Sequence, residues 1–160
     1  MRERLRGGHW RRGCWSRRYH GNDSAVSGDK NGSCAVFSAF EAGDVDVETF
    51  NHRAHVRVAW HALEALPLLE ALPRFCAGLR ALVRAHGAEA KFNATMSVAF
   101  LLLVSERRRR GESWAVFEER EHDFIAAGLE PVLAVYDREQ LEAPCARASF
   151  ELPALDAVGG

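Results

Sequence analysis

Residues 96–104 read MSVAFLLLV, and this stretch decides the fold. Apolar side chains fill nearly every position, which is typical of a helix that is buried on all sides. A helix is therefore expected over residues 94–109, with the arginines at 107–110 placed favourably beside the negative end of its dipole. The longest apolar run, residues 98–104, is far too short to cross a bilayer. The stretch predicts the central helix of a globular domain that has no membrane partner.

The sequence on both sides of this stretch has the periodicity of amphipathic helices and the signals that start them. Thr49 or Asn51 can cap the first of these helices, Ser113 precedes another, and Pro131 suits a first-turn position. The predicted helices other than the central one cover residues 52–66, 68–86, 114–127 and 131–141. Short connections between successive helices favour an all-α fold, a compact antiparallel bundle of about five helices.

The chain divides by composition into an N-terminal arm and one helical domain. Residues 1–34 contain eight Lys or Arg and three acidic residues, whereas the rest of the chain contains thirteen basic and nineteen acidic residues. The basic arm has no apolar period that could fix it to a core. Residues 1–38 are therefore expected to be disordered, and residues 39–156 to form the domain. Residues 34–40 have weak strand character, and the C-terminal tail is expected to pack through Phe150 and Leu152.

Charge and cysteine content limit the partners and the compartment. Trp10 and Trp15 alternate with arginines that could contact nucleic acid, but no nucleic-acid-binding fold accompanies them, so nucleic acid is not an expected partner. The four cysteines form no CxxC pair, which indicates reduced thiols in the cytosol. The N-terminal residues contain no apolar core of a secretory signal. We expect a cytoplasmic protein whose oligomeric state stays open, a homodimer included.

The strongest chemical signal is the pair His52 and His55, which opens the predicted helix 52–66. Their spacing puts both imidazoles on one side of the helix, within reach of one metal ion or one substrate. The positive end of the helix dipole disfavours protonated histidine, which keeps both rings available as ligands or bases. The same helix end favours an anionic ligand. The spacing alone is also consistent with two histidines that lie three positions apart by chance.

A second candidate is Glu119 with His122, the Glu-x-x-His step of carboxylate-bridged metal sites. Charged residues surround this step on every side, which favours a solvated helix face instead. The sequence contains no phosphate-binding glycine loop, serine nucleophile elbow, zincin motif or zinc-finger spacing. These absences exclude particular motif classes but not an enzyme whose site residues are scattered along the chain.

Three motifs give the chain a resemblance to a family. Residues 50–60, FNHRAHVRVAW, resemble the opening motif F-x-H-R-x-H-(x)3-A-W of an uncharacterised family of small bacterial helical proteins. Those proteins continue with a Tyr-His-Glu-Thr-(x)-Thr motif that leads into an apolar helix, where this chain has FNATMS at residues 92–97. They carry a later Tyr followed by Ala-Arg-x-x-Phe, which Tyr136 and residues 146–150 match. The similarity covers about residues 40–155.

The resemblance implies that residues from the three motifs belong to one site, although no activity is attached to the family. The expected catalytic residues are His52, His55, Asn93 and Thr95, and the expected substrate-binding residues are Arg53, Trp60, Tyr136 and Arg147. Asn93 stands where the family has a histidine, so a three-histidine metal cage would be incomplete. His52 and His55 could still hold a divalent transition metal such as Zn, Fe or Cu, with water in the open positions.

Two classes of function fit these observations. The first is an enzyme that tailors a small, anionic metabolite in a pocket between the helices predicted at 52–66 and 94–109, with Arg53 or Arg147 orienting the anion. Its chemistry would be metal-assisted, or metal-free acid–base catalysis by one imidazole oriented by the other. The second is a non-catalytic ligand-binding or interaction module, in which the histidines form a polar network that fixes the start of a helix.

Overall fold

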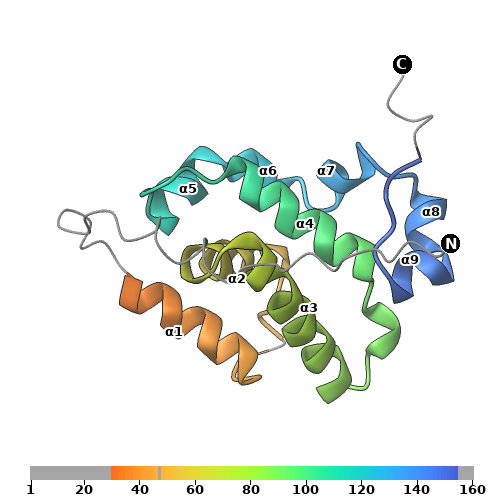
Figure 1. Ribbon diagram of the computed structural model, residues 1–160, viewed down its shortest axis with the longest axis horizontal. Helices are drawn as coiled ribbons and strands as arrows, with labels where there is room; N and C mark the ends of the chain where they lie inside the picture. Colours follow the sequence, from red (N-terminus) through yellow and green to blue (C-terminus); the bar gives the residue numbers. More distant parts are fainter. Residues whose placement is uncertain (1–29, 47, 155–160) are drawn as a thin grey trace, which may run out of the picture.

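The computed structural model describes residues 30–46 and 48–154, and all regular structure within them is helical (Figure 1). α2 (His52–Ala65) lies between α1 (Lys30–Glu41) and α4 (Ala94–Arg107). α3 (Leu68–Ala85) packs against all three of these helices. The predicted all-α bundle is confirmed, with five described helices of seven or more residues.

The remaining helices are short and lie mainly along the other side of α4 (Figure 1). They are η1 (Glu89–Lys91), α5 (Trp114–Arg120), α6 (His122–Ala126), α7 (Glu130–Leu133), α8 (Arg138–Glu142) and α9 (Pro144–Ala148). α5 and α6 contact α2, whereas α7 and α9 contact α4. The chain therefore returns at α9 to the beginning of α4, where residues from the second and third sequence motifs meet.

Side-chain caps fix where three helices begin. The carboxamide of Asn51 accepts a backbone hydrogen bond at the start of α2, and Asn93 does the same at α4. The hydroxyl of Ser113 caps α5, as predicted. Of the two residues predicted to cap α2, the structure therefore uses Asn51. These contacts satisfy backbone amides that have no partner inside the helix.

α1 shows that the folded part begins before the predicted boundary at residue 39. Phe37 and Phe40 are 2% and 1% exposed, and the Phe40 ring packs against Phe75 of α3. Gly78 of α3 permits this contact, because a Cβ atom there would lie 2.3 Å from the Phe40 ring. Assigning residues 30–38 to the arm, and weak strand character to residues 34–40, was therefore wrong. The disorder predicted for the residues before Lys30 falls outside the described residues.

The C-terminal third is more broken than the periodicity predicted. The helix predicted over 114–127 is divided at Glu121, whose backbone leaves the helical region (φ −105°, ψ 24°). The helix predicted over 131–141 is divided into α7 and α8, because Asp137 is extended. The prediction that Phe150 and Leu152 pack inward is wrong, since they are 41% and 74% exposed. Instead, side chains from the rest of the domain form hydrogen bonds with backbone atoms of the tail.

α4 is less enclosed than its apolar sequence suggested. Leu101 and Val104 are fully buried, but Leu102 is 39% exposed, so the prediction of burial on every face is wrong at that position. The reason is that α2, α3, α7 and α9 cover most but not all of the helix circumference. None of the helices within the described residues is both long and apolar enough to span a bilayer.

Candidate functional site

The site is built on the first turn of α2. Asn51 has an extended backbone, and its side chain accepts a hydrogen bond from the Ala54 amide (3.1 Å), which fixes where the helix starts. His52 and His55 follow immediately and lie three positions apart. Residues at this spacing share one face of a helix. The start of α2 therefore directs both imidazoles to the side that meets α3 and α4.

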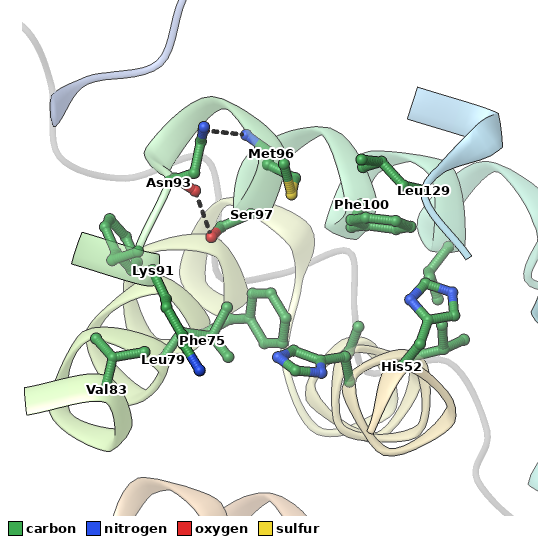
Figure 2. A pocket seen from close by; sticks show the side chains of 15 residues that line it. His52, Phe75, Leu79, Val83, Lys91, Asn93, Met96, Ser97, Phe100 and Leu129 are labelled. Atoms are coloured by element: carbon green, nitrogen blue, oxygen red, sulfur yellow. Dashed lines mark hydrogen bonds between the residues drawn. The ribbon is translucent and has the colours of Figure 1, made fainter. Parts of the chain in front are cut away.

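Both histidines line a pocket of about 310 Å³ between α2, α3, η1 and α4 (Figure 2). The pocket is walled mostly by apolar side chains, among them Phe75 and Phe100. Figure 2 shows His52 beside Phe100 on one side, with Lys91 and Asn93 on the opposite side. The polar lining residues are His52, His55, Lys91, Asn93 and Ser97. Concave, mainly apolar sites with a few placed polar groups are the usual form of small-molecule sites.

The tautomer of His55 follows from its hydrogen bond. Its Nδ1 lies 3.0 Å from the backbone carbonyl oxygen of Asn51. A carbonyl oxygen can only accept, so Nδ1 carries the proton and donates it. In the neutral ring the lone pair therefore belongs to Nε2. The ring also lies against Phe50, with 4.3 Å between ring centroids, so a backbone atom and an aromatic side chain together fix its orientation.

His52 offers a polar atom that the described residues leave unsatisfied. Its Nε2 is buried and has no hydrogen-bond partner among them. The ring packs against Phe100, with 5.0 Å between the centroids. A buried nitrogen without a hydrogen-bond partner is costly, and the residue that carries it lines the pocket.

Burial keeps both imidazoles neutral. It lowers the pKa of His55 below its ordinary value of 6.5, an effect that the Asn51 carbonyl opposes. It also lowers the pKa of His52, and the charge that His55 would carry lowers it further. Near neutral pH the pocket therefore contains two uncharged rings, each with a ring nitrogen able to accept a proton.

Asn93 lines the same pocket, but its side chain is already used. Its oxygen accepts from the Met96 amide (2.9 Å), and its nitrogen donates to the Leu141 carbonyl (2.6 Å). The hydroxyl of Ser97 donates to the backbone oxygen of Asn93 (2.7 Å) and can still accept a hydrogen bond. Asn93 thus borders the same pocket as the histidines, while its amide has a structural role.

Thr95 lies away from the pocket. Its side chain is fully buried, and its hydroxyl donates to the Ser149 carbonyl (3.1 Å) and accepts from the Glu151 amide (3.0 Å). The second and third sequence motifs therefore do meet, but at a structural junction. The grouping of Thr95 with the histidines around one cavity, expected from the resemblance, is wrong.

The four residues expected to bind substrate do not line the pocket. Arg53 is exposed and forms an ion pair with Glu118. Trp60 is buried among aromatic rings of the core. Tyr136 is buried and donates to a backbone carbonyl of the tail. Arg147 donates to a backbone carbonyl of η1 and borders a neighbouring cavity of about 130 Å³.

The side chains near the histidine pair limit how a metal ion could be bound. Among residues 30–46 and 48–154, no three His, Cys, Asp or Glu side chains are grouped so that they could hold a metal ion. The pair His52 and His55 supplies two nitrogens at most, and the Asn93 carboxamide, a poor transition-metal ligand, is held by its hydrogen bonds to Met96 and Leu141. Glu119 and His122 are both exposed, in agreement with the solvated face predicted for them.

Most of the lining was not predicted from the sequence, and three of the unpredicted residues bear directly on the chemistry of the pocket. Phe100 covers His52, Ser97 places a hydroxyl in the wall, and Lys91 adds a positive charge. Lys91 directly precedes the residues 92–97 that carry the second motif, which was the available signal. Phe100 and Ser97 could not be recognised, because helical periodicity does not distinguish a core side chain from one that borders a cavity.

No protein-family model, curated protein or solved structure matches the chain. The resemblance to small bacterial helical proteins therefore remains a prediction.

Proposed function

We propose that the pocket is the active site of a small enzyme that performs acid–base chemistry on a mostly apolar metabolite. One observation carries the proposal: two uncharged imidazoles border an otherwise largely apolar cavity of about 310 Å³. A cavity of this size can enclose a molecule of modest size. A neutral histidine with a fixed tautomer is the usual general base in proteins.

The two rings have different roles in this proposal. His55 is the base, because its Nδ1–H is fixed on the Asn51 carbonyl and its lone pair is on Nε2. His52, which lines the same pocket and packs against Phe100, orients the reacting group. We favour acid–base over metal-assisted chemistry because the described residues supply no third ligand beside the pair.

The proposal can be tested with 5-nitrobenzisoxazole, a flat aromatic probe. A base removes its carbon-bound proton, the N–O bond breaks, and the cyanophenolate product absorbs visible light, so no co-reactant is needed. We expect the protein to accelerate this reaction and His55→Gln to lower the rate at least about tenfold. His122→Gln, on an exposed residue, is the matched control and should leave the rate unchanged.

The expected pH profile follows from the lowered pKa of His55. The rate should rise with pH through a midpoint below 6.5 and then level off, because the base is deprotonated above that midpoint. A rate no higher than that of imidazole in solution, or equal rates in wild type and His55→Gln, would overturn the assignment of the base.

One observation favours the alternative of ligand binding without catalysis. Besides the histidines, the polar side chains in the wall include Asn93 and Ser97, and both take part in the hydrogen bonds that start α4. Binding of the probe without conversion, weakened by His52→Gln, would support this second function.

A further inference from the structure

The lining of the pocket is electrically asymmetric. Among the described residues that line the pocket, Lys91 on η1 is the only one with a permanent charge. The histidines are neutral near pH 7, and the other lining side chains are apolar or uncharged. In Figure 2, His52 and Lys91 are on opposite sides of the pocket. A ligand that spans the cavity therefore meets the uncharged imidazole of His52 at one end and the cation of Lys91 at the other.

Lys91 is available to a ligand. It is exposed, and its ammonium group has no acidic partner within 4.0 Å among the described residues. By contrast, Arg53, Arg74, Arg107, Arg108 and Arg120 each form an ion pair. No existing ion pair with a described residue therefore has to be broken before Lys91 can pair with an incoming anion.

A second positive charge lies next to Phe92, the residue that follows Lys91 in the lining of the pocket. Arg80 stacks on the ring of Phe92, with 4.6 Å from its guanidinium carbon to the ring centroid, and Phe92 lines the pocket. Arg80 donates to the Ala148 backbone carbonyl (3.3 Å) but has no acidic partner among the described residues. One cation that lines the pocket and a second that stacks on a lining side chain, both without an acidic partner among the described residues, favour an anionic over a cationic ligand.

We propose that the substrate is a small apolar acid, whose carboxylate or similar anionic group pairs with Lys91 while its apolar body extends toward His52 and His55. This inference rests on the proposed function, because it assigns the substrate class of the same pocket. The apolar walls formed by Phe75, Phe100 and their neighbours bind the body of the molecule, and Lys91 sets its direction. The reacting atom then lies at the histidines rather than at the charged end.

A matched pair of probes tests the substrate class. 3-Phenylpropanoate and 3-phenylpropan-1-ol have the same apolar body and differ in the negative charge. Binding of each is measured by saturation-transfer NMR titration. We expect the acid to bind about threefold to fivefold more tightly at low salt, the size of one exposed ion pair, and the preference to shrink as salt increases.

Variants assign the preference to Lys91 and the binding to the pocket. Lys91→Met should remove the preference for the acid and leave binding of the alcohol unchanged. Arg110→Met removes an exposed cation that does not line the pocket, so the preference should persist. Ala59→Leu should fill the cavity and weaken both probes, whereas Ala77→Leu, on the exposed side of α3, should not. If Ala59→Leu fails to fold by circular dichroism, Leu79→Phe serves the same purpose.

The outcomes separate the two proposals. Equal affinities for acid and alcohol, or a preference that survives Lys91→Met, would overturn the assignment of an apolar acid while leaving the pocket as the binding site. Absence of binding by both probes, or binding that neither cavity-filling variant weakens, would overturn the proposed function and this inference together.

Discussion

The side-chain amide of Asn93 joins two ends of the domain, because its oxygen caps α4 while its nitrogen donates to the Leu141 carbonyl (2.6 Å). Asn93 and Leu141 are both buried and lie 48 positions apart in the chain. A residue expected to take part in chemistry therefore connects the start of α4 to the end of α8. Its replacement should affect stability first.

Asn93→Ala should lower the free energy of unfolding by about 2 to 3 kcal/mol, because it removes a cap and leaves a buried carbonyl without its donor. Urea denaturation followed by circular dichroism measures the change. Asn51→Ala is the matched control, since it removes the cap of α2 at an exposed position and should cost only about 1 kcal/mol. Equal losses in the two variants would show that the bond to Leu141 contributes nothing.

The histidine pair should make stability depend on pH. The folded-state pKa values of His52 and His55 lie below 6.5, so below about that pH the unfolded chain binds protons that the folded chain does not. Stability should therefore be complete above pH 6.5 and should fall as the pH decreases through the folded-state values. Urea unfolding at pH 7.5 and pH 5.5 measures the difference.

A double variant isolates the histidine contribution from that of the carboxylates. His52→Gln with His55→Gln should reduce the loss of stability between pH 7.5 and 5.5, whereas His122→Gln should leave it as in wild type. An unchanged loss in the double variant would show that the pocket histidines are not the groups that titrate.

The contact between Phe40 and Gly78 should make an otherwise favourable substitution harmful. Alanine normally stabilises a helix interior by about 1 kcal/mol relative to glycine. At Gly78 the added methyl group would lie 2.3 Å from the Phe40 ring, so Gly78→Ala should instead destabilise by about 1 to 3 kcal/mol. Thermal unfolding measures the sign. Phe40→Leu with Gly78→Ala should lose less than the two single variants added together, and strict additivity would contradict the clash.

The hydroxyl of Thr95 should be needed to hold the tail. Thr95→Val keeps the shape of the side chain but leaves the Ser149 carbonyl and the Glu151 amide without partners. We expect a loss of about 1 to 3 kcal/mol and faster amide hydrogen exchange at Glu151. Ser105→Ala, in the last turn of α4, should change neither quantity. Unaltered exchange at Glu151 in Thr95→Val would mean that the tail is fixed by other contacts.

Much of the fold was predictable because the relevant signals are local. The caps Asn51 and Ser113 and the apolar periods of α2, α3 and α4 depend on residues close in sequence. α1 was missed because the arginine-rich segment before it dominated the composition, although Phe37 and Phe40 lie on one helical face. The breaks near Glu121 and Asp137 are set by packing between distant segments, which the periodicity does not record.

The site was predictable only in part, for a related reason. The spacing of His52 and His55 determines that they share a helix face, and Asn93 does border the same pocket. Whether a polar side chain faces a cavity or is used elsewhere depends on tertiary partners. Arg53 is paired with Glu118, and Thr95 with the tail, through contacts more than fifty positions apart in the chain.

The tail beyond α9 is attached through its main chain rather than its side chains. Thr95, Tyr136 and Gln140 all bind backbone atoms of residues 149–152, while Phe150 and Leu152 are 41% and 74% exposed. Because these hydrogen bonds are made to backbone atoms, they depend on the spacing of residues 149–152 along the chain and little on which side chains these residues carry. Evolution can therefore exchange the outward residues of this segment freely, whereas a single insertion, or a proline that removes the amide of residue 151, would detach it.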